Sequence, residues 1–120
     1  MIVKYASVKK GAIVLVPFPF SDLSGYKTRP ALVLGVNNKA SRVIVCFIGS
    51  RLEKLDKNFD IMIKESHKNF RATGLKIASL IKTDKIASFS FEILYGIIGS
   101  LSANIVKQVD NKLKILLSLK

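Results

Sequence analysis

Two prolines interrupt the first apolar run of the chain and limit what that run can form. Ala12 to Phe20 has the sequence AIVLVPFPF, with Pro17 and Pro19 spaced by two. The run is nine residues long, whereas a membrane-spanning helix needs about 20. Its β-branched start, Ala12 to Val16, is typical of a buried strand. Because both prolines remove a donor from the same strand edge, we expect ladder pairing to end there.

Later segments also have the composition or the alternation of short strands. They are Pro30 to Val36, Arg42 to Ile48, Phe59 to Ile63, Leu75 to Ile81 and Ile93 to Ile98. The turn residues Asn37-Asn38-Lys39 join the first two, which predicts a hairpin. In the third segment Asp60 alternates with apolar residues, as in a half-buried strand. We expect Lys64 to Thr73 to be polar and mobile, and the mixed stretch Lys82 to Phe91 favours no element.

The spacing of apolar residues changes at the end of the chain. Behind Ser102, which is in the position of an N-cap, apolar residues recur at intervals of three and four. They are Ile105, Val106, Val109, Leu113, Leu116 and Leu117. This pattern predicts one amphipathic helix of about four turns, packed on the sheet. Several strands and one terminal helix predict a small, strongly curved antiparallel sheet or barrel, SH3-like or OB-like, with residues 1–120 as a single domain.

The charge of the chain indicates the kind of partner. There are 20 Lys and Arg residues against 8 Asp and Glu residues, a formal net charge of +12. Such an excess attracts polyanions, so nucleic acid is the first candidate, an anionic membrane surface the second and an acidic protein the third. Hydrophobic residues make up 49% of the chain, which excludes intrinsic disorder. The basic amino terminus leads into the proline-broken run and not into a signal-peptide core, so we expect a cytoplasmic protein.

The cysteine and histidine content limits the chemistry. Cys46 is the single cysteine, which excludes an internal disulfide and a cysteine-based zinc site. We expect its side chain to be buried in an apolar strand. His67 is the single histidine, which excludes catalysis by a histidine pair, and its polar neighbours predict a solvated loop.

Three motifs follow one another along the chain. Gly11 to Gly35 has the sequence GAIVLVPFPFSDLSGYKTRPALVLG, Ile44 to Ser50 has IVCFIGS, and Gly74 to Lys85 has GLKIASLIKTDK. This order, together with the closing helix, resembles the MazF/PemK-type toxins of toxin–antitoxin modules. The family pattern is a glycine, an apolar strand, a PFPFSD-like segment, a loop and RPALVL. The first motif is the most specific, and the resemblance covers nearly the whole chain.

The resemblance implies a mainly β fold with a C-terminal amphipathic helix: a curved SH3-like antiparallel barrel of the MazF/CcdB type that forms a homodimer. It also implies a sequence-specific endoribonuclease that needs no metal or other cofactor. Such enzymes use the 2′-hydroxyl of single-stranded RNA as the nucleophile and leave a 2′,3′-cyclic phosphate and a 5′-hydroxyl. An acidic, partly disordered antitoxin is the implied inhibitor.

Cleavage of this type needs a proton acceptor, a proton donor and a cation for the charge on the phosphorane. Arg29 suits the last role because a guanidinium binds two phosphate oxygens and stays charged. Lys82 and Asp84 are two residues apart and point to one face if the strand continues that far. They match an arginine and an aspartate that act as acid and base in some family members. An exposed ion pair is the alternative interpretation of these two residues.

The end of the predicted strand Arg42 to Ile48 departs from the family pattern. Ser50 matches a small hydroxyl residue and is a candidate to bind a phosphate oxygen or to orient the 2′-hydroxyl. The position before it is usually a threonine that is often catalytic, and this chain has Gly49 there. Its backbone N–H can bind phosphate, but glycine supplies no hydroxyl. Either Ser50 takes over the hydroxyl role, or the activity is weak, altered or lost.

The first loop and its neighbours supply candidates for RNA binding. Phe20 and Tyr26 offer stacking faces for bases, and Asp22 either positions Arg29 or caps a turn. The other candidates are Ser21, Lys27, Thr28, Gly49 and Arg51, with Arg42, Lys54 and Lys57 as further cations.

Three functions remain open at this stage. The first is a ribosome-independent mRNA interferase that cleaves single-stranded RNA and has no membrane partner. The second is a non-catalytic member of the same fold, which binds RNA or inhibits DNA gyrase; Gly49 supports it, while Arg29, Lys82 and Asp84 oppose it. The third is a cationic membrane-surface protein, which rests on the charge and the terminal helix alone.

Overall fold

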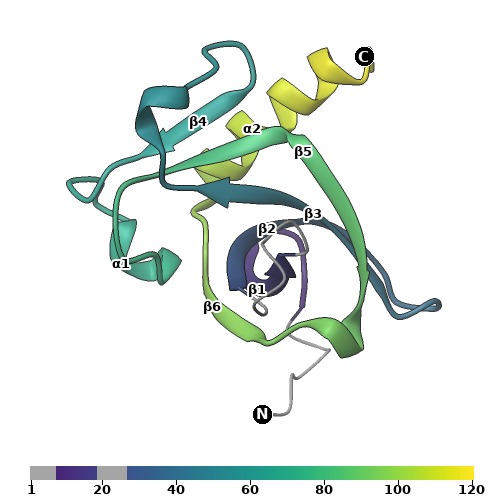
Figure 1. Ribbon diagram of the computed structural model, residues 1–120. Coiled ribbons are helices and arrows are strands. Elements are labelled where there is room, and N and C mark those ends of the chain that lie inside the picture. The colour runs from purple at the N-terminus through teal and green to yellow at the C-terminus, as the bar shows by residue number, and fades with distance from the viewer. Residues whose placement is uncertain (1–7, 19–26) are drawn as a thin grey trace.

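Six strands form one antiparallel sheet in the computed structural model, which describes residues 8–18 and 27–120. Their spatial order is β4-β5-β3-β2-β1-β6. The sheet curls into a half-barrel in which β5 and β6 bend around β1 and β2 (Figure 1). The predicted mainly β fold with a curved antiparallel sheet is therefore confirmed. The strands are β1 (Ala12–Phe18), β2 (Lys27–Asn37), β3 (Arg42–Gly49), β4 (Asp60–Ile63), β5 (Ser79–Ser90) and β6 (Gly96–Ser100).

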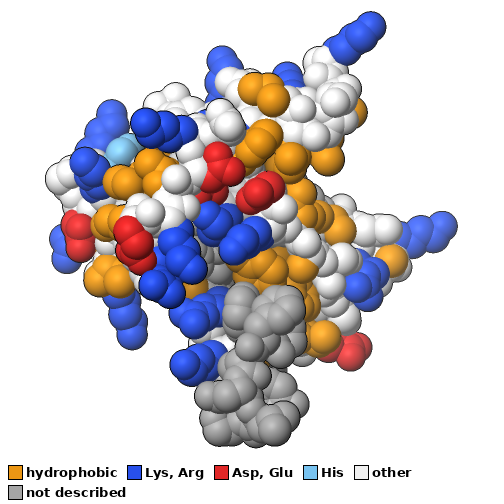
Figure 2. Space-filling model, turned by 45° about the horizontal axis from the view of Figure 1, so that its top comes forward, with side chains coloured by type: hydrophobic (Ala, Val, Ile, Leu, Met, Phe, Trp, Pro, Cys, Tyr) orange, Lys and Arg blue, Asp and Glu red, His pale blue; other side chains and the backbone are white. Residues whose placement is uncertain are grey.

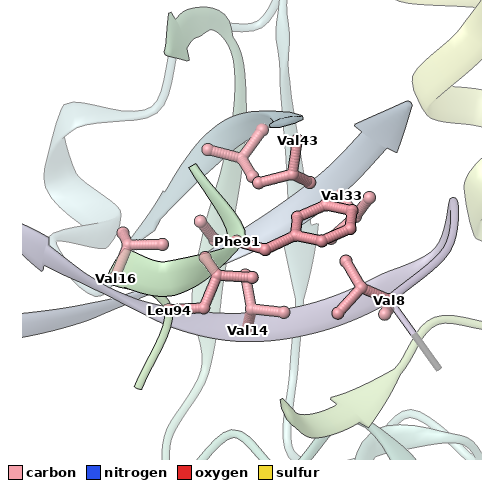
Figure 3. Packing of buried hydrophobic residues seen from close by; sticks show 10 residues of the cluster. Val8, Val14, Val16, Val33, Val43, Phe91 and Leu94 are labelled. Carbon is pink, nitrogen blue, oxygen red and sulfur yellow. The ribbon is translucent and has the colours of Figure 1, made fainter. Parts of the chain in front are cut away.

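The central strands β1, β2 and β3 are buried on both faces of the sheet, and β2 and β3 form the predicted hairpin. Successive side chains of a strand point to opposite faces, so each central strand contributes to two hydrophobic clusters. Figure 3 shows the ring of Phe91 among Val14, Val33 and Val43. This Phe91 cluster consists of Val8, Ala12, Val14, Val16, Ala31, Val33, Val43, Val45, Phe91 and Leu94. The Val109 cluster consists of Ile13, Leu32, Cys46, Ile48, Ile61, Ile63, Ile81, Leu101, Ile105 and Val109.

The C-terminal helix α2 (Ala103–Leu116) packs on the sheet through the Val109 cluster. Ile105 and Val109 are its buried residues, and both belong to the predicted apolar stripe, so the predicted amphipathic helix is confirmed. Ser102 occupies the N-cap position, but its hydroxyl makes no capping hydrogen bond. Within residues 8–18 and 27–120, no helix has the length and hydropathy to cross a membrane.

The strand β1 extends beyond the point at which the prolines predict its end. It pairs with β2 through Pro17 as far as Phe18, which lies opposite Lys27. On its other side, the pairing with β6 ends at Leu15. A proline is tolerated where one side of a strand is unpaired, because the missing donor then removes no ladder bond. The prediction was therefore wrong for the β2 side of the strand.

The middle of the chain differs from the prediction in three places. The polar stretch 64–73 contains the short helix α1 (Phe70–Thr73). The predicted strand from Leu75 begins only at Ser79, and it continues through the stretch to which no element was assigned. The last strand begins at Gly96, after a 3₁₀ turn η3 (Phe91–Ile93). A second 3₁₀ turn, η2 (Leu52–Lys54), follows β3.

Candidate active site

A pocket lined by cations lies where β2, β3 and β5 meet. We call it the cation pocket, and its volume is about 230 Å³. Among the described residues that line it, five are basic and none is acidic. On the face drawn in Figure 2, Lys and Arg side chains gather beside exposed hydrophobic side chains. The pocket is lined by Arg29, Phe47, Ile48, Gly49, Ser50, Arg51, Lys54, Leu80, Lys82 and Lys85.

The register of the sheet explains why residues distant in sequence meet at this pocket. β3 runs antiparallel to β2 on one side and to β5 on the other, so its carboxyl end lies beside the start of both. Ala31 is opposite Phe47, which places Arg29 beside the end of β3. Gly49 is opposite Leu80 at the start of β5. Three of the four candidate catalytic residues, Arg29, Ser50 and Lys82, therefore line one pocket.

Lys82 is held in the pocket wall by an ion pair with a buried carboxylate. Its Nζ lies 2.5 Å from Oδ2 of Asp60. The side chain of Asp60 is 0% exposed and that of Lys82 is 16% exposed. In the ladder between β4 and β5 the two residues are directly opposite each other. Sequence reasoning missed Asp60, because the alternation of a strand predicts faces and does not predict the cross-strand partner.

Asp84 does not line the cation pocket. The ion pairs among the described residues include Lys82 with Asp60 and none between Lys82 and Asp84. Both Lys82 and Asp84 lie on β5, as the prediction required. However, the register between β3 and β5 shifts between Cys46 and Ile48, which leaves residues 82–85 without partners on β3. Such a bulge interrupts strict alternation, so a spacing of two does not bring these side chains together.

A second pocket shares a wall with the first. We call it the apolar pocket, and its volume is about 400 Å³. Both pockets are lined by Arg29, Ile48, Gly49 and Ser50. The other residues that line the apolar pocket are Leu15, Thr28, Pro30, Gly74, Leu75, Lys76, Ile77, Ser79 and Ile98.

The segment between α1 and β5 forms one side of the apolar pocket. Gly74 ends α1 with a φ of 73°, and a Cβ on this residue would lie 2.1 Å from the carbonyl oxygen of Ile98. The hydroxyl of Thr73 accepts a hydrogen bond of 3.1 Å from the backbone N–H of Leu75. The close backbone contact and this hydrogen bond fix where Leu75 and Ile77 enter the pocket wall.

The other predicted binding residues lie in different places. Lys27 and Thr28 are exposed at the start of β2, and Thr28 lines the apolar pocket. Arg42 starts β3 and Gly49 ends it, so Arg42 lies away from both pockets. Lys57 lines neither pocket. Four candidates lie outside the described residues, namely Phe20, Ser21, Asp22 and Tyr26.

Two side chains that often act in catalysis stand apart from this site. Cys46 is buried, as predicted. Burial raises the pKa of its thiol to about 12, and the carboxylate of Asp84 adds to the rise, so Cys46 is not a nucleophile at neutral pH. His67 is half-buried in a turn, where its Nδ1 accepts a hydrogen bond from the backbone N–H of Asn69. Its predicted solvated position is therefore only partly correct.

An exposed ion pair lies at the edge of the cation pocket. Nε of Arg51 donates a hydrogen bond of 2.9 Å to Oε1 of Glu53. A hydrogen bond to its own backbone, followed by that from Arg51, lowers the pKa of the Glu53 carboxyl. The carboxylate thus offsets part of the charge of Arg51.

Comparisons with known proteins give a family match and similar solved structures. Residues 9–117 match a family model described as PemK-like, MazF-like toxin of type II toxin–antitoxin system. The comparison with curated proteins gives no match.

Among solved structures, a MazE–MazF complex from Deinococcus radiodurans has a TM-score of 0.71 and 20% identity, over 93% of this chain and 97% of that chain. The Mycobacterium tuberculosis toxin MazF-mt6 has a TM-score of 0.69 and 18% identity, over 91% and 98%. An endoribonuclease in complex with its cognate antitoxin, from a mycobacterial species, has a TM-score of 0.67 and 16% identity, over 93% and 96%. At these identities, the likeness to the solved structures shows the fold.

Proposed function

The chain belongs to the PemK-like, MazF-like family of toxins of type II toxin–antitoxin systems, and we propose that it is a metal-independent, sequence-specific endoribonuclease acting on single-stranded RNA. The observation that supports this proposal best is the convergence of Arg29, Ser50 and Lys82 on one pocket whose described lining residues include five basic and no acidic side chains. Phosphodiester chemistry needs such a concentration of positive charge at the reacting phosphate.

In the proposed reaction the 2′-hydroxyl of the RNA attacks the adjacent phosphorus. Its proton leaves to an acceptor, a new bond forms between O2′ and phosphorus, and the bond from phosphorus to O5′ breaks. The departing O5′ takes up a proton, so the products are a 2′,3′-cyclic phosphate and a 5′-hydroxyl. No water and no redox step are involved.

The residues of the cation pocket have separate roles in this reaction. The Arg29 guanidinium binds two non-bridging oxygens and stabilises the phosphorane. The Lys82 ammonium lies in the same wall and supplies the proton for O5′. Ser50 orients the 2′-hydroxyl. The proton acceptor is not among the described residues that line the cation pocket; Asp84, an exposed carboxylate further along β5, is proposed for this role from the family resemblance.

The apolar pocket is proposed to hold a base next to the cleaved bond. The wall that it shares with the cation pocket supports this proposal, because an apolar surface then adjoins the proposed phosphate site. Leu75 and Ile77 provide that surface, and Arg29 lies between the two pockets. Bases splayed out of single-stranded RNA are recognised in this way by stacking and apolar contact.

We also propose an antitoxin partner and a homodimer. The solved relatives include a MazE–MazF complex and an endoribonuclease bound to its cognate antitoxin. The net charge of +12 favours an acidic, partly disordered antitoxin that folds as it binds and competes with RNA for the same cations.

One observation favours a second candidate function. Gly49 stands where the family resemblance expects a threonine, so the wall of the cation pocket lacks one hydroxyl group. This substitution would favour a protein that binds RNA, or inhibits DNA gyrase, and does not cut RNA.

The test is RNA cleavage by the purified protein in excess EDTA. We expect fragments with 2′,3′-cyclic phosphate and 5′-hydroxyl ends. Arg29→Ala should lower the cleavage rate on the order of 100-fold or more, since it removes the main charge at the phosphorane. Arg42→Ala is the matched control, an exposed arginine at the other end of β3, and should leave the rate unchanged.

Two outcomes would contradict the proposed reaction. Intact RNA at high protein concentration, with RNA still bound, would support the non-catalytic binder. Cleavage that depends on added metal, or that leaves 3′-hydroxyl ends, would exclude attack by the 2′-hydroxyl.

A further inference from the structure

The carboxylate of Asp60 is an unusual group in this molecule because it is fully buried beside a pocket of cations. Its side chain is 0% exposed. Oδ2 receives the Nζ of Lys82 at 2.5 Å and the backbone N–H of Asp56 at 2.9 Å. Oδ1 has no hydrogen-bond partner among the described residues. Burying a carboxylate is costly unless it is paired, so a fold that keeps Asp60 here has a use for its charge.

Stability alone does not explain this ion pair. A buried ion pair is often no more stabilising than apolar residues of the same volume. Apolar side chains are readily accommodated near Asp60. Ile61 on β4 and Ile81 on β5 both belong to the Val109 cluster. What an apolar pair cannot do is hold an ammonium group at a fixed point.

The ion pair is asymmetric in a way that suits positioning. Asp60 lies wholly inside the molecule, whereas Lys82 is partly exposed and lines the cation pocket. The remaining lysines of the pocket, Lys54 and Lys85, are exposed and make none of the ion pairs found among the described residues. Lys82 is therefore the lysine of this pocket whose ammonium is held by a buried carboxylate.

The turn before β4 holds Asp60 in place. The backbone N–H of Asp60 donates a hydrogen bond of 2.9 Å to the carbonyl of Asp56, while Oδ2 of Asp60 accepts from the N–H of Asp56. Nζ of Lys112, on α2, donates to the carbonyls of Lys57 and Asn58 at 3.4 and 3.1 Å. The turn is thus bound both to β4 and to the helix behind it, which leaves the carboxylate little freedom to move.

We propose that Asp60 is a positioning residue for the reaction: through its buried carboxylate it holds the Lys82 ammonium at the wall of the cation pocket, where the leaving O5′ of the RNA receives its proton. This inference rests on the proposed endoribonuclease function. Asp60 does not touch the RNA and acts only through Lys82. Misplacing a reacting group by about 1 Å can cost about 100-fold in rate.

The experiment is a double-mutant cycle with Asp60→Asn and Lys82→Met. Asn keeps the shape of Asp60 and can accept the Asp56 N–H, but it lacks the charge that holds Lys82. We expect kcat to fall by about tenfold to 100-fold, with KM and RNA affinity within about twofold. The double variant should be no slower than Lys82→Met alone, because both changes remove the same contribution.

Asp110→Asn is the matched control. Asp110 also forms an ion pair, with Lys10 at 2.8 Å, but it is partly exposed and lies away from the cation pocket. Its loss should leave kcat unchanged. The proposal would be overturned if Asp60→Asn left kcat unchanged. It would also be overturned if the double variant lost kcat by the product of the two single losses.

A second measurement does not depend on activity. Acylation by acetic anhydride, followed by mass spectrometry, reports how available each lysine amine is to the reagent, and an ion pair with a carboxylate lowers that availability. Asp60→Asn should speed the labelling of Lys82 severalfold and leave that of Lys85 unchanged. Equal labelling of Lys82 in both proteins would refute the positioning role. If the wild type cleaves no RNA, the proposed function fails, while the labelling still decides whether Asp60 holds Lys82.

Asp60→Glu is the variant to use if Asp60→Asn does not fold. It keeps the charge but displaces it by one methylene, so kcat should lie between those of the wild type and Lys82→Met. A folded Asp60→Glu with full kcat and unchanged Lys82 labelling would show that the position of this carboxylate is unimportant, and the proposal would be wrong.

Discussion

The cation pocket and the apolar pocket share one wall but differ in what supports them. The cation pocket is built from strand ends, with Arg29, Ser50 and Lys82 placed by the register of β2, β3 and β5. The apolar pocket takes one side from the segment after α1, which depends on close packing against β6. The charge proposed to bind a phosphate and the apolar surface proposed to bind a base therefore come from separate parts of the fold. Mutations should be able to change one of these two functions without changing the other.

The largest expected effect comes from Gly74→Ala, which disturbs the apolar pocket alone. The φ of 73° is unfavourable for alanine, and its Cβ would lie 2.1 Å from the carbonyl oxygen of Ile98. We expect the free energy of unfolding to fall by about 3 kcal/mol, as measured by urea denaturation. Because Leu75 and Ile77 would shift with Gly74, discrimination among RNA sequences should weaken in the protein that remains folded.

Gly35→Ala is the matched control for this change. A Cβ at Gly35 would meet no heavy atom within 4 Å, and its φ is not in the left-handed region. Its unfolding free energy should change by less than about 1 kcal/mol. Equal stability of the two alanine variants would show that the α1–β6 contact does not support the apolar pocket.

Ile77→Asp should separate the two pockets at the level of activity. Ile77 is 53% exposed and lines the apolar pocket, so a carboxylate there would remove apolar surface and repel RNA with little cost to folding. We expect kcat/KM to fall by about tenfold, with a larger fall for some RNA sequences than for others.

Ile93→Asp provides the comparison, since Ile93 is 45% exposed and lines neither pocket. Its kcat/KM should stay within about twofold of the wild type, because its new charge lies outside the site. A uniform loss across all RNA sequences in Ile77→Asp would argue against base recognition in the apolar pocket.

These two pockets also show how far the sequence alone could predict the site. Arg29, Ser50 and Lys82 were predicted as candidates because they match motifs of the family that the chain resembles. The register of β2, β3 and β5 then explains why they line one pocket. The pairing of Lys82 with Asp60 was not predicted, because it depends on the register between β4 and β5 and on a bulge that separates Lys82 from Asp84.

The apolar pocket was less accessible to sequence reasoning. Gly74 and Leu75 were noted as part of a motif, but nothing in their spacing predicts that α1 packs against β6. A contact of this kind depends on tertiary packing between segments that are distant in sequence. Local propensity does not determine such packing, which is also why a polar stretch expected to be mobile contains a helix.

Lys85→Ala tests the cation pocket by its dependence on salt. Lys85 is exposed and lines this pocket only, so its loss should weaken the binding of every RNA sequence equally. We expect about fivefold weaker binding at low salt, and a slope of log K against log salt that is smaller by about 0.7. Lys39→Ala, in the exposed turn between β2 and β3, should leave the slope unchanged. A change of sequence preference in Lys85→Ala would mean that the two pockets are not independent.

Gly49→Thr tests the wall that the pockets share, and it has the smallest expected effect. A Cβ at Gly49 would meet no heavy atom within 4 Å, so packing does not require glycine here and the threonine side chain has open space on the pocket side of β3. Because Gly49 lines both pockets, the added hydroxyl would stand at their shared wall, where it can bind a phosphate oxygen. One added hydrogen bond corresponds to about a threefold rise in kcat, measured under single-turnover conditions. Gly49→Val, of nearly the same shape but without the hydroxyl, should give no rise. Equal rises in kcat for both variants would mean that the shared wall acts by its shape. A rise in Gly49→Thr alone would mean that the missing hydroxyl limits the rate of cleavage, while the charge of the cation pocket is already sufficient to bind RNA.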